Sequence, residues 1–288
     1  MDIEVTHRRR RPLSGVELLG PAARRLISPD RWTDAYPATP EHAKELDVLL
    51  MFADTLGCLP IFVPKLESRN AQRDEALEEL RVAYWLHHSG FPVVEWEPPG
   101  LNGKVGEYLI GSPDNANIFV EVKSPGWEGV LSDEKRRAGR TKQPKYINLE
   151  GGAFGNWQPL QRCIASEHTY PKFAPTQPNL LVVADDLHVS LLDSPDHVEI
   201  ALYADHAMYG EMGYFTSPRF ENLGGLAIFR AAQFFGGHGV EYEFTIFDNP
   251  FALPSTKLPD SILKFRTLAR GMVRGTAVTR WEERWTKR

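Results

Sequence analysis

The alternation of apolar and polar residues predicts a strand between Asn117 and Pro125. Three aliphatic residues point to one face of this strand and belong in a core: Ile118, Val120 and Val122. The opposite face ends in Glu121 and Lys123, whose charged heads emerge on the same side. Burying a carboxylate and an ammonium for packing alone costs free energy, so these two residues are the first candidates for chemistry.

Helical periodicity predicts two helices upstream of this strand, over residues 40–54 and 73–88. In the second helix, apolar residues lie three, four and seven positions after Glu79, so its carboxylate leans toward the apolar side. Glu75 and Glu78 are expected to face water. A slip in the helical register would put either of them in the place of Glu79.

Two further strands are predicted at 91–97 and 106–110, and the turn-rich segment 111–117 joins the second of them to the charged strand. This arrangement is an antiparallel hairpin. It brings Glu107 toward the end of the strand that carries Glu121. Glu107 is therefore a second candidate carboxylate, although a glutamate at a strand edge is also compatible with simple solvation.

The continuous apolar run 179–185 is typical of a central buried strand, and a helix before it would allow a crossover to a parallel position. Residues 57–65, with two prolines, are expected to break the helical region. The other expected elements are strands at 199–203, 225–229 and 240–247 and helices at 15–27, 156–168 and 263–285.

These elements predict an α/β fold: a mixed central sheet flanked by helices, with a helical N-terminal region and extra C-terminal strands. We expect three regions. Residues 1–72 form an N-terminal arm and helical region, and residues 73–195 form the α/β core. Residues 196–288 add strands and a basic helical tail packed on that core.

Composition and charge exclude several classes of protein. The 288 residues are 42% hydrophobic and 25% charged, which is ordinary for a globular chain. No apolar run reaches the roughly 20 residues needed to span a bilayer, and two cysteines suit a reducing, cytoplasmic compartment. The net charge of −5 argues against non-specific coating of nucleic acid. An enzyme on nucleic acid remains compatible, because a metal held by carboxylates reverses the local charge.

Glu79, Glu107, Glu121 and Lys123 thus follow one another on a helix, a strand and a second strand. This order, with the sequence F-V-E-V-K-S around the last two, resembles the PD-(D/E)XK, or restriction-endonuclease-like, nuclease superfamily. The resemblance covers residues 74–125 and, more loosely, the chain up to residue 185. The chain departs from the family at Glu107, where Asp is usual, and the longer side chain reaches one methylene further.

The resemblance implies a restriction-endonuclease-like core and hydrolysis of phosphodiester bonds with Mg²⁺ or Mn²⁺. Glu107 and Glu121 would be the metal ligands, because carboxylate oxygens suit Mg²⁺. Glu79 would reach a second metal or a metal-bound water, and Lys123 would orient the attacking water or help to deprotonate it. These four residues are the expected catalytic set.

A basic run at 135–145 would contact phosphates beside such a site, through Lys135, Arg136, Arg137 and Arg140. By default it is a solvated loop. We expect DNA rather than RNA as the partner, and no membrane. A homo-oligomer is compatible with the sequence, which also leaves endonuclease and exonuclease activity open.

Two other interpretations stay open. In the first, the protein keeps the nuclease fold but is catalytically silent and serves as a nucleic-acid or partner-binding module. In the second, Glu107, Glu121 and Lys123 form a structural ion cluster, since a glutamate two residues before a lysine on a strand is a common surface pair.

Overall fold

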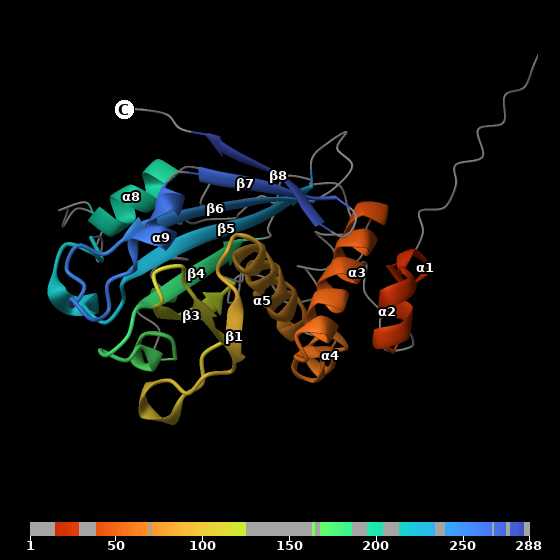
Figure 1. Cartoon of the computed structure of the whole chain (residues 1–288), viewed down its shortest axis with the longest axis horizontal. Coiled ribbons are helices and arrows are strands. Elements are labelled where there is room, and N and C mark those ends of the chain that lie inside the picture. The colour runs from red at the N-terminus through yellow and green to blue at the C-terminus, as the bar shows by residue number, and fades with distance from the viewer. Residues whose placement is uncertain are drawn as a thin grey trace, which may run out of the picture.

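The structure is a computed structural model whose described residues are 15–28, 39–68, 71–124, 163–164, 168–185, 195–203, 213–233, 240–266, 268–274 and 277–284. Over these ranges the chain forms an eight-stranded open sheet with helices packed against it (Figure 1). The predicted α/β class with a mixed sheet is confirmed. None of the helices in the described ranges has the length and apolarity that spanning a bilayer requires.

The elements follow the chain in a simple order. The strands are β1 (Val93–Trp96), β2 (Tyr108–Gly111), β3 (Asn117–Lys123), β4 (Asn179–Asp185), β5 (Gly225–Gln233), β6 (Val240–Asp248), β7 (Leu268–Arg274) and β8 (Ala277–Arg284). The helices are α1 (Gly15–Leu18), α2 (Pro21–Leu26), α3 (Pro40–Thr55), α4 (Leu59–Leu66), α5 (Ala71–His88), α8 (Pro195–Tyr203) and α9 (Asp260–Leu263). Short 3₁₀ helices that matter below are η2 (Leu101–Gly103), η3 (Tyr170–Lys172), η5 (Pro218–Phe220) and η6 (Lys264–Arg266).

The spatial order of the strands is the same as their order in the sequence, from β1 to β8. β1, β2 and β3 pair antiparallel, and β4 lies parallel to both β3 and β5. From β5 to β8 the pairing is again antiparallel, so these strands continue the same sheet. The predicted hairpin and the predicted parallel central strand are both confirmed.

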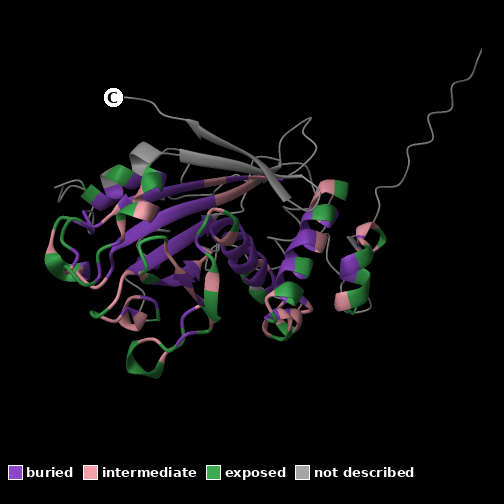
Figure 2. Ribbon diagram, viewed as in Figure 1, coloured by how far each residue is buried: buried purple, intermediate pink, exposed green. Residues whose placement is uncertain are grey.

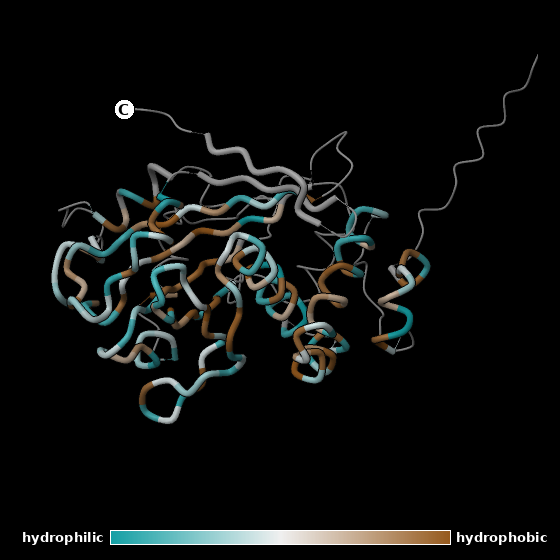
Figure 3. The backbone as a smooth tube through the Cα atoms, in the orientation of Figure 1, coloured by the Kyte–Doolittle hydropathy of each residue, from teal (hydrophilic) through white to brown (hydrophobic). Residues whose placement is uncertain are grey.

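Two hydrophobic cores cover the two faces of the sheet. The first joins α2, α3, α4 and α5 to one face, and it contains Ile118, Val120 and Val122 of β3. The second joins α8 and the loops around η3 and η5 to the opposite face, and it contains Phe119. The alternation predicted for β3 is therefore confirmed. Hydrophobic stretches concentrate along the strands of the sheet, whereas the loops at its rim are more polar (Figure 3).

The central part of helix α5 is enclosed, because the sheet covers one side and α3 and α4 cover the other (Figure 2). Every residue from Ala76 to Leu86 is buried. The expectation that Glu75 faces water is confirmed, but the same expectation for Glu78 is wrong. The periodicity predicted a polar, solvent-exposed face on α5, but α3 and α4 pack against α5 and bury much of that face.

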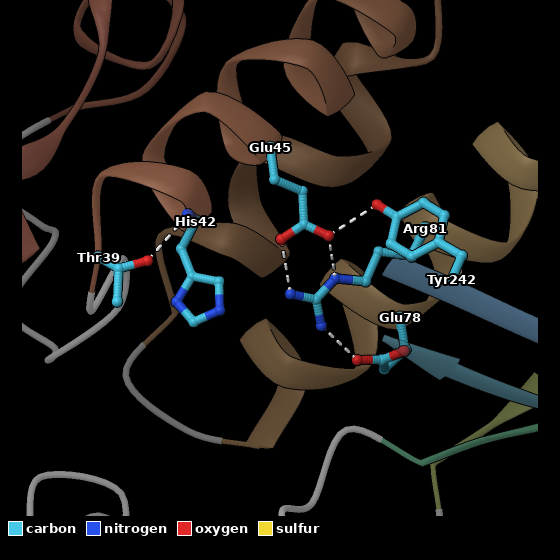
Figure 4. Close-up of polar contacts among 6 residues, drawn as sticks. All are labelled: Thr39, His42, Glu45, Glu78, Arg81 and Tyr242. Atoms are coloured by element: carbon cyan, nitrogen blue, oxygen red, sulfur yellow. Dashed lines mark hydrogen bonds and ion pairs between the residues drawn. The ribbon is translucent and has the colours of Figure 1, made fainter. Parts of the chain in front are cut away.

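The buried charges of α5 are instead matched by a polar network between α3, α5 and β6 (Figure 4). The guanidinium of Arg81 donates to both carboxylate oxygens of Glu45, at 2.8 and 2.9 Å, and a third nitrogen donates to Glu78. The hydroxyl of Tyr242 also donates to Glu45, at 2.6 Å. Burial raises the pKa of Glu45, but the charge and hydrogen bonds of Arg81 outweigh it, and the net pKa lies below its usual value.

The predicted strand at 199–203 is wrong, because this segment lies in helix α8. Val198, Ala201 and Leu202 are buried in the second core, and their spacing of three and four positions is that of a helix. A five-residue window containing alternating Ile200 and Leu202 hides this longer period.

The predicted basic helical tail at 263–285 is also wrong. Only its first residues are helical, in α9 and η6, and residues 268–274 and 277–284 form the strands β7 and β8. Residues 240–244 of β6 would otherwise form an edge with unpaired backbone groups, and β7 pairs with these residues. The sequence of β7 itself does not reveal that β6 will pair with it. Local propensity therefore favoured a helix over a strand.

Three smaller differences concern helix boundaries. The break expected at 57–65 contains α4, with Pro60 in its first turn and Pro64 inside it. The helix expected at 15–27 is divided into α1 and α2. Most of the helix expected at 156–168 lies outside the described residues. Within this segment, the described Cys163 and Ile164 are helical.

Candidate active site

Strand β3 positions the central carboxylate and the first lysine. Glu121 and Lys123 share the face of Phe119, two positions apart, as strand geometry requires. The Nζ atom of Lys123 lies 2.7 Å from Oε1 of Glu121. The Glu121 side chain is 0% exposed, whereas Lys123 keeps partial access to solvent. Burial lowers the pKa of Lys123, but the charge and hydrogen bond of Glu121 outweigh this, so its net pKa is raised.

A second lysine, Lys172 at the end of η3, contacts the same carboxylate. Its Nζ atom lies 2.6 Å from Oε1 of Glu121, and its side chain is 13% exposed. The other oxygen, Oε2, is buried and has no hydrogen-bond partner among the described residues. Sequence reasoning missed Lys172, because nothing in the sequence near it marks a contact with a strand 51 positions away.

Glu107 lies immediately before β2 and beside Glu121. Its backbone N–H donates to the carbonyl of Val120 at 3.2 Å. The next residue, Tyr108, lies opposite Val120 in the antiparallel pairing of β2 with β3. Burial raises the pKa of Glu107, and the charges of Glu79 and Glu121 raise it further, to about 8. The negative charges of Glu79 and Glu121 thus favour the protonated form of Glu107 when no cation is present.

Glu79 reaches the same group of charges from α5. Its Oε2 lies 3.0 Å from the Nζ of Lys65 on α4, and the Glu79 side chain is 10% exposed. Burial raises the pKa of Glu79, and the positive charges of Lys65 and Lys123 only partly offset this effect. The charge of Lys123 also acts on Glu79, which links this ion pair electrostatically to the group on β3. Lys65, like Lys172, was not among the predicted residues.

The structure therefore brings Glu79, Glu107, Glu121 and Lys123 into one electrostatic group and adds Lys65 and Lys172 to it. Three carboxylates face three ammonium groups. Tyr108, which follows Glu107, lies in the same field: burial raises its pKa well above the usual value, and the three carboxylates raise it further.

One pair of carboxylates in this group has the donor chemistry that a divalent cation requires. Within the described segments, no set of three or more His, Cys, Asp or Glu side chains is arranged to hold a metal ion. Mg²⁺ is commonly held by one or two carboxylates together with waters and substrate oxygens. The buried Oε2 of Glu121, which has no hydrogen-bond partner in the described part of the chain, and the neighbouring Glu107 make such a pair. A cation there would satisfy this oxygen and favour the ionised form of Glu107.

The expected nucleic-acid contacts lie elsewhere. Lys135, Arg136, Arg137 and Arg140 fall outside the described residues. Their predicted contact with phosphates stays a prediction.

Comparison with known proteins identifies no relative: no family model, no curated protein and no solved structure matches this chain. The interpretation of the site therefore rests on its residues and their geometry.

Proposed function

We propose that this protein is a metal-dependent nuclease that hydrolyses phosphodiester bonds, with a restriction-endonuclease-like core and DNA as the preferred substrate. One observation carries the proposal. The Glu121 carboxylate is held by two lysines through one oxygen, while its other oxygen is buried, lacks a hydrogen-bond partner within the described residues, and lies next to a carboxyl group of raised pKa. An unsatisfied buried acceptor costs about 1–3 kcal/mol, and a cation bound at this oxygen would remove that cost.

In this proposal, Glu107 and Glu121 hold Mg²⁺ or Mn²⁺ beside the scissile phosphate. When bound, the cation supplies positive charge next to the phosphate and makes nearby water more acidic. The carboxylates orient the cation because β3 and the β2–β3 hairpin fix their backbones.

Lys123 acts on the attacking water and on the phosphate. Its raised pKa keeps it charged at neutral pH, so it donates hydrogen bonds and does not accept a proton. Contact with Oε1 of Glu121 fixes its ammonium at the solvent-accessible end of the site. We therefore assign Lys123 to orienting water and stabilising developing negative charge, rather than to proton abstraction.

The experiment that tests this proposal measures cleavage of single-stranded and double-stranded DNA and RNA with Mg²⁺ or Mn²⁺. We expect cleavage by the natural protein and none by Lys123→Ala or Glu121→Gln. Lys257→Ala is the matched control, because Lys257 is an exposed lysine outside the group of Glu79, Glu107, Glu121 and their lysines. Thermal melting of each variant reports whether it is folded.

Cleavage that persists in Lys123→Ala would reject the assignment. Binding without cleavage under any divalent cation, with an affinity that falls as salt rises, would instead identify a catalytically silent nucleic-acid-binding module. Absence of both metal binding and nucleic-acid binding would leave the structural ion cluster.

A further inference from the structure

Lys65 is held in place by more than its ion pair with Glu79. Its Nζ atom lies 5.5 Å from the centre of the Phe62 ring, one helical turn earlier on α4. That ring packs edge-on against Trp96 of β1, at 5.3 Å between ring centres. Helix α4 in turn packs along α5, which carries Glu79. The ammonium is therefore fixed at the Glu79 carboxylate by an aromatic neighbour as well as by charge.

We propose that Lys65 takes the place of a second divalent cation, so that the site binds one divalent cation between Glu107 and Glu121 and no second one at Glu79. This inference rests on the proposed metal-dependent function and specifies its metal stoichiometry. It also changes the role expected for Glu79, which would not ligate a metal.

Contact distances favour one occupant at Glu79. An ammonium 3.0 Å from Oε2 uses the lone-pair side of that oxygen. A Mg²⁺ ion would have to approach an oxygen of the same carboxylate to about 2.0–2.1 Å. Both cations would then share one carboxylate in a site that excludes much of the water, and their repulsion there is only weakly screened.

The charges of the whole group support the same stoichiometry. Three carboxylates, Glu79, Glu107 and Glu121, are balanced by the ammonium groups of Lys65, Lys123 and Lys172. One divalent cation would give the site a surplus of two positive charges. Two positive charges match the two negative charges of the transition state of phosphodiester hydrolysis. A second divalent cation would raise the surplus to four positive charges.

The test counts Mn²⁺ ions per chain by titration, using the paramagnetic resonance signal of free Mn²⁺ and calorimetry. We expect one Mn²⁺ for the natural protein and for Lys65→Arg, which keeps the positive charge. Lys65→Gln removes the charge but keeps a hydrogen-bond donor for Glu79, and we expect it to bind a second Mn²⁺. Lys257→Gln, at an exposed lysine outside the site, is the matched control and should bind one.

The outcomes separate this inference from the function on which it rests. Two Mn²⁺ ions in the natural protein would overturn the inference and leave the metal-dependent function standing. No Mn²⁺ in the natural protein would overturn the function itself. A single Mn²⁺ in folded Lys65→Gln would show that Lys65 does not exclude a second cation. The count for the natural protein decides the stoichiometry even if a variant fails to fold.

Discussion

The Nζ atom of Lys172 lies 2.6 Å from Oε1 of Glu121, across 51 positions of the chain. The contact depends on η3, which ends at Lys172, and on η2, which supports it: Asn102 donates to the carbonyl of Pro171 at 3.4 Å. Glu121 is thus fixed from two directions, by Lys123 on its own strand and by Lys172 from the connection to β4. Its remaining oxygen, Oε2, is buried and has no hydrogen-bond partner within the described residues.

Replacement of Lys172 by methionine should weaken both stability and activity. It removes one charge-assisted contact from a buried carboxylate but leaves Lys123, so we expect a loss of about 1–3 kcal/mol in the free energy of unfolding. The rate of cleavage should fall by about one to two orders of magnitude as Glu121 loses its fixed orientation. Urea denaturation and single-turnover cleavage measure the two effects. Equal values for Lys172→Met and the exposed control Lys257→Met would show that the contact has no role.

Glu107 should make stability depend on pH. Its pKa rises from an ordinary 4.5 to about 8 in the folded protein, so between these values the folded state holds more protons than the unfolded state. The free energy of unfolding should therefore fall as pH rises from about 4.5 to about 8. Glu107→Gln cannot ionise and should lose this dependence, gaining stability relative to the natural protein as pH rises. Denaturation curves over this range, without divalent cations, provide the measurement, and parallel pH profiles of the two proteins would contradict the assignment.

The buried network around Arg81 should be a major source of stability. Arg81→Met leaves the carboxylates of Glu45 and Glu78 buried without their guanidinium, and we expect a loss of about 3–5 kcal/mol. Tyr242→Phe removes one hydrogen bond to Glu45 and should cost about 1 kcal/mol. Chemical denaturation of both variants tests this order. A smaller loss in Arg81→Met than in Tyr242→Phe would show that the ion network is not what stabilises the packing of α3, α5 and β6.

Gly106 should be required for the position of Glu107. A methyl group at Gly106 would lie 2.3 Å from the Phe119 ring, which is fully buried in the second core. Gly106→Ala should therefore destabilise the protein by about 1–3 kcal/mol and reduce cleavage through displacement of Glu107. Gly111→Ala is a matched control, because its added methyl would meet its nearest neighbour at an ordinary 3.4 Å. Adding Phe119→Leu to Gly106→Ala should restore part of the stability; if it does not, the ring is not the obstacle.

Much of the fold follows from local patterns in the sequence. The alternation along β3 assigns its two faces, and the turn-rich segment before it produces the predicted hairpin with β2. Helical periodicity locates α5 and orients Glu79 away from water. These features depend on residues close in the chain, so one sequence contains enough information to predict them.

The features that failed depend on distant parts of the chain. Lys65 and Lys172 join the carboxylates through tertiary contacts, and an isolated lysine in a helix or a loop carries no sign of such a partner. Glu78 is buried because α3 covers α5, which periodicity within α5 cannot reveal. β7 and β8 form because β6 offers an edge, and that edge exists only once the sheet is assembled.

The most direct test of the proposed function is the position of a divalent cation in the folded protein. Crystals soaked with Mn²⁺ and measured for anomalous scattering would locate it. We expect one Mn²⁺ between Glu107 and Glu121, in contact with Oε2 of Glu121, with Lys65 still bound to Glu79. Mn²⁺ absent from these two carboxylates at saturating concentration, or bound only elsewhere, would contradict the metal-dependent nuclease.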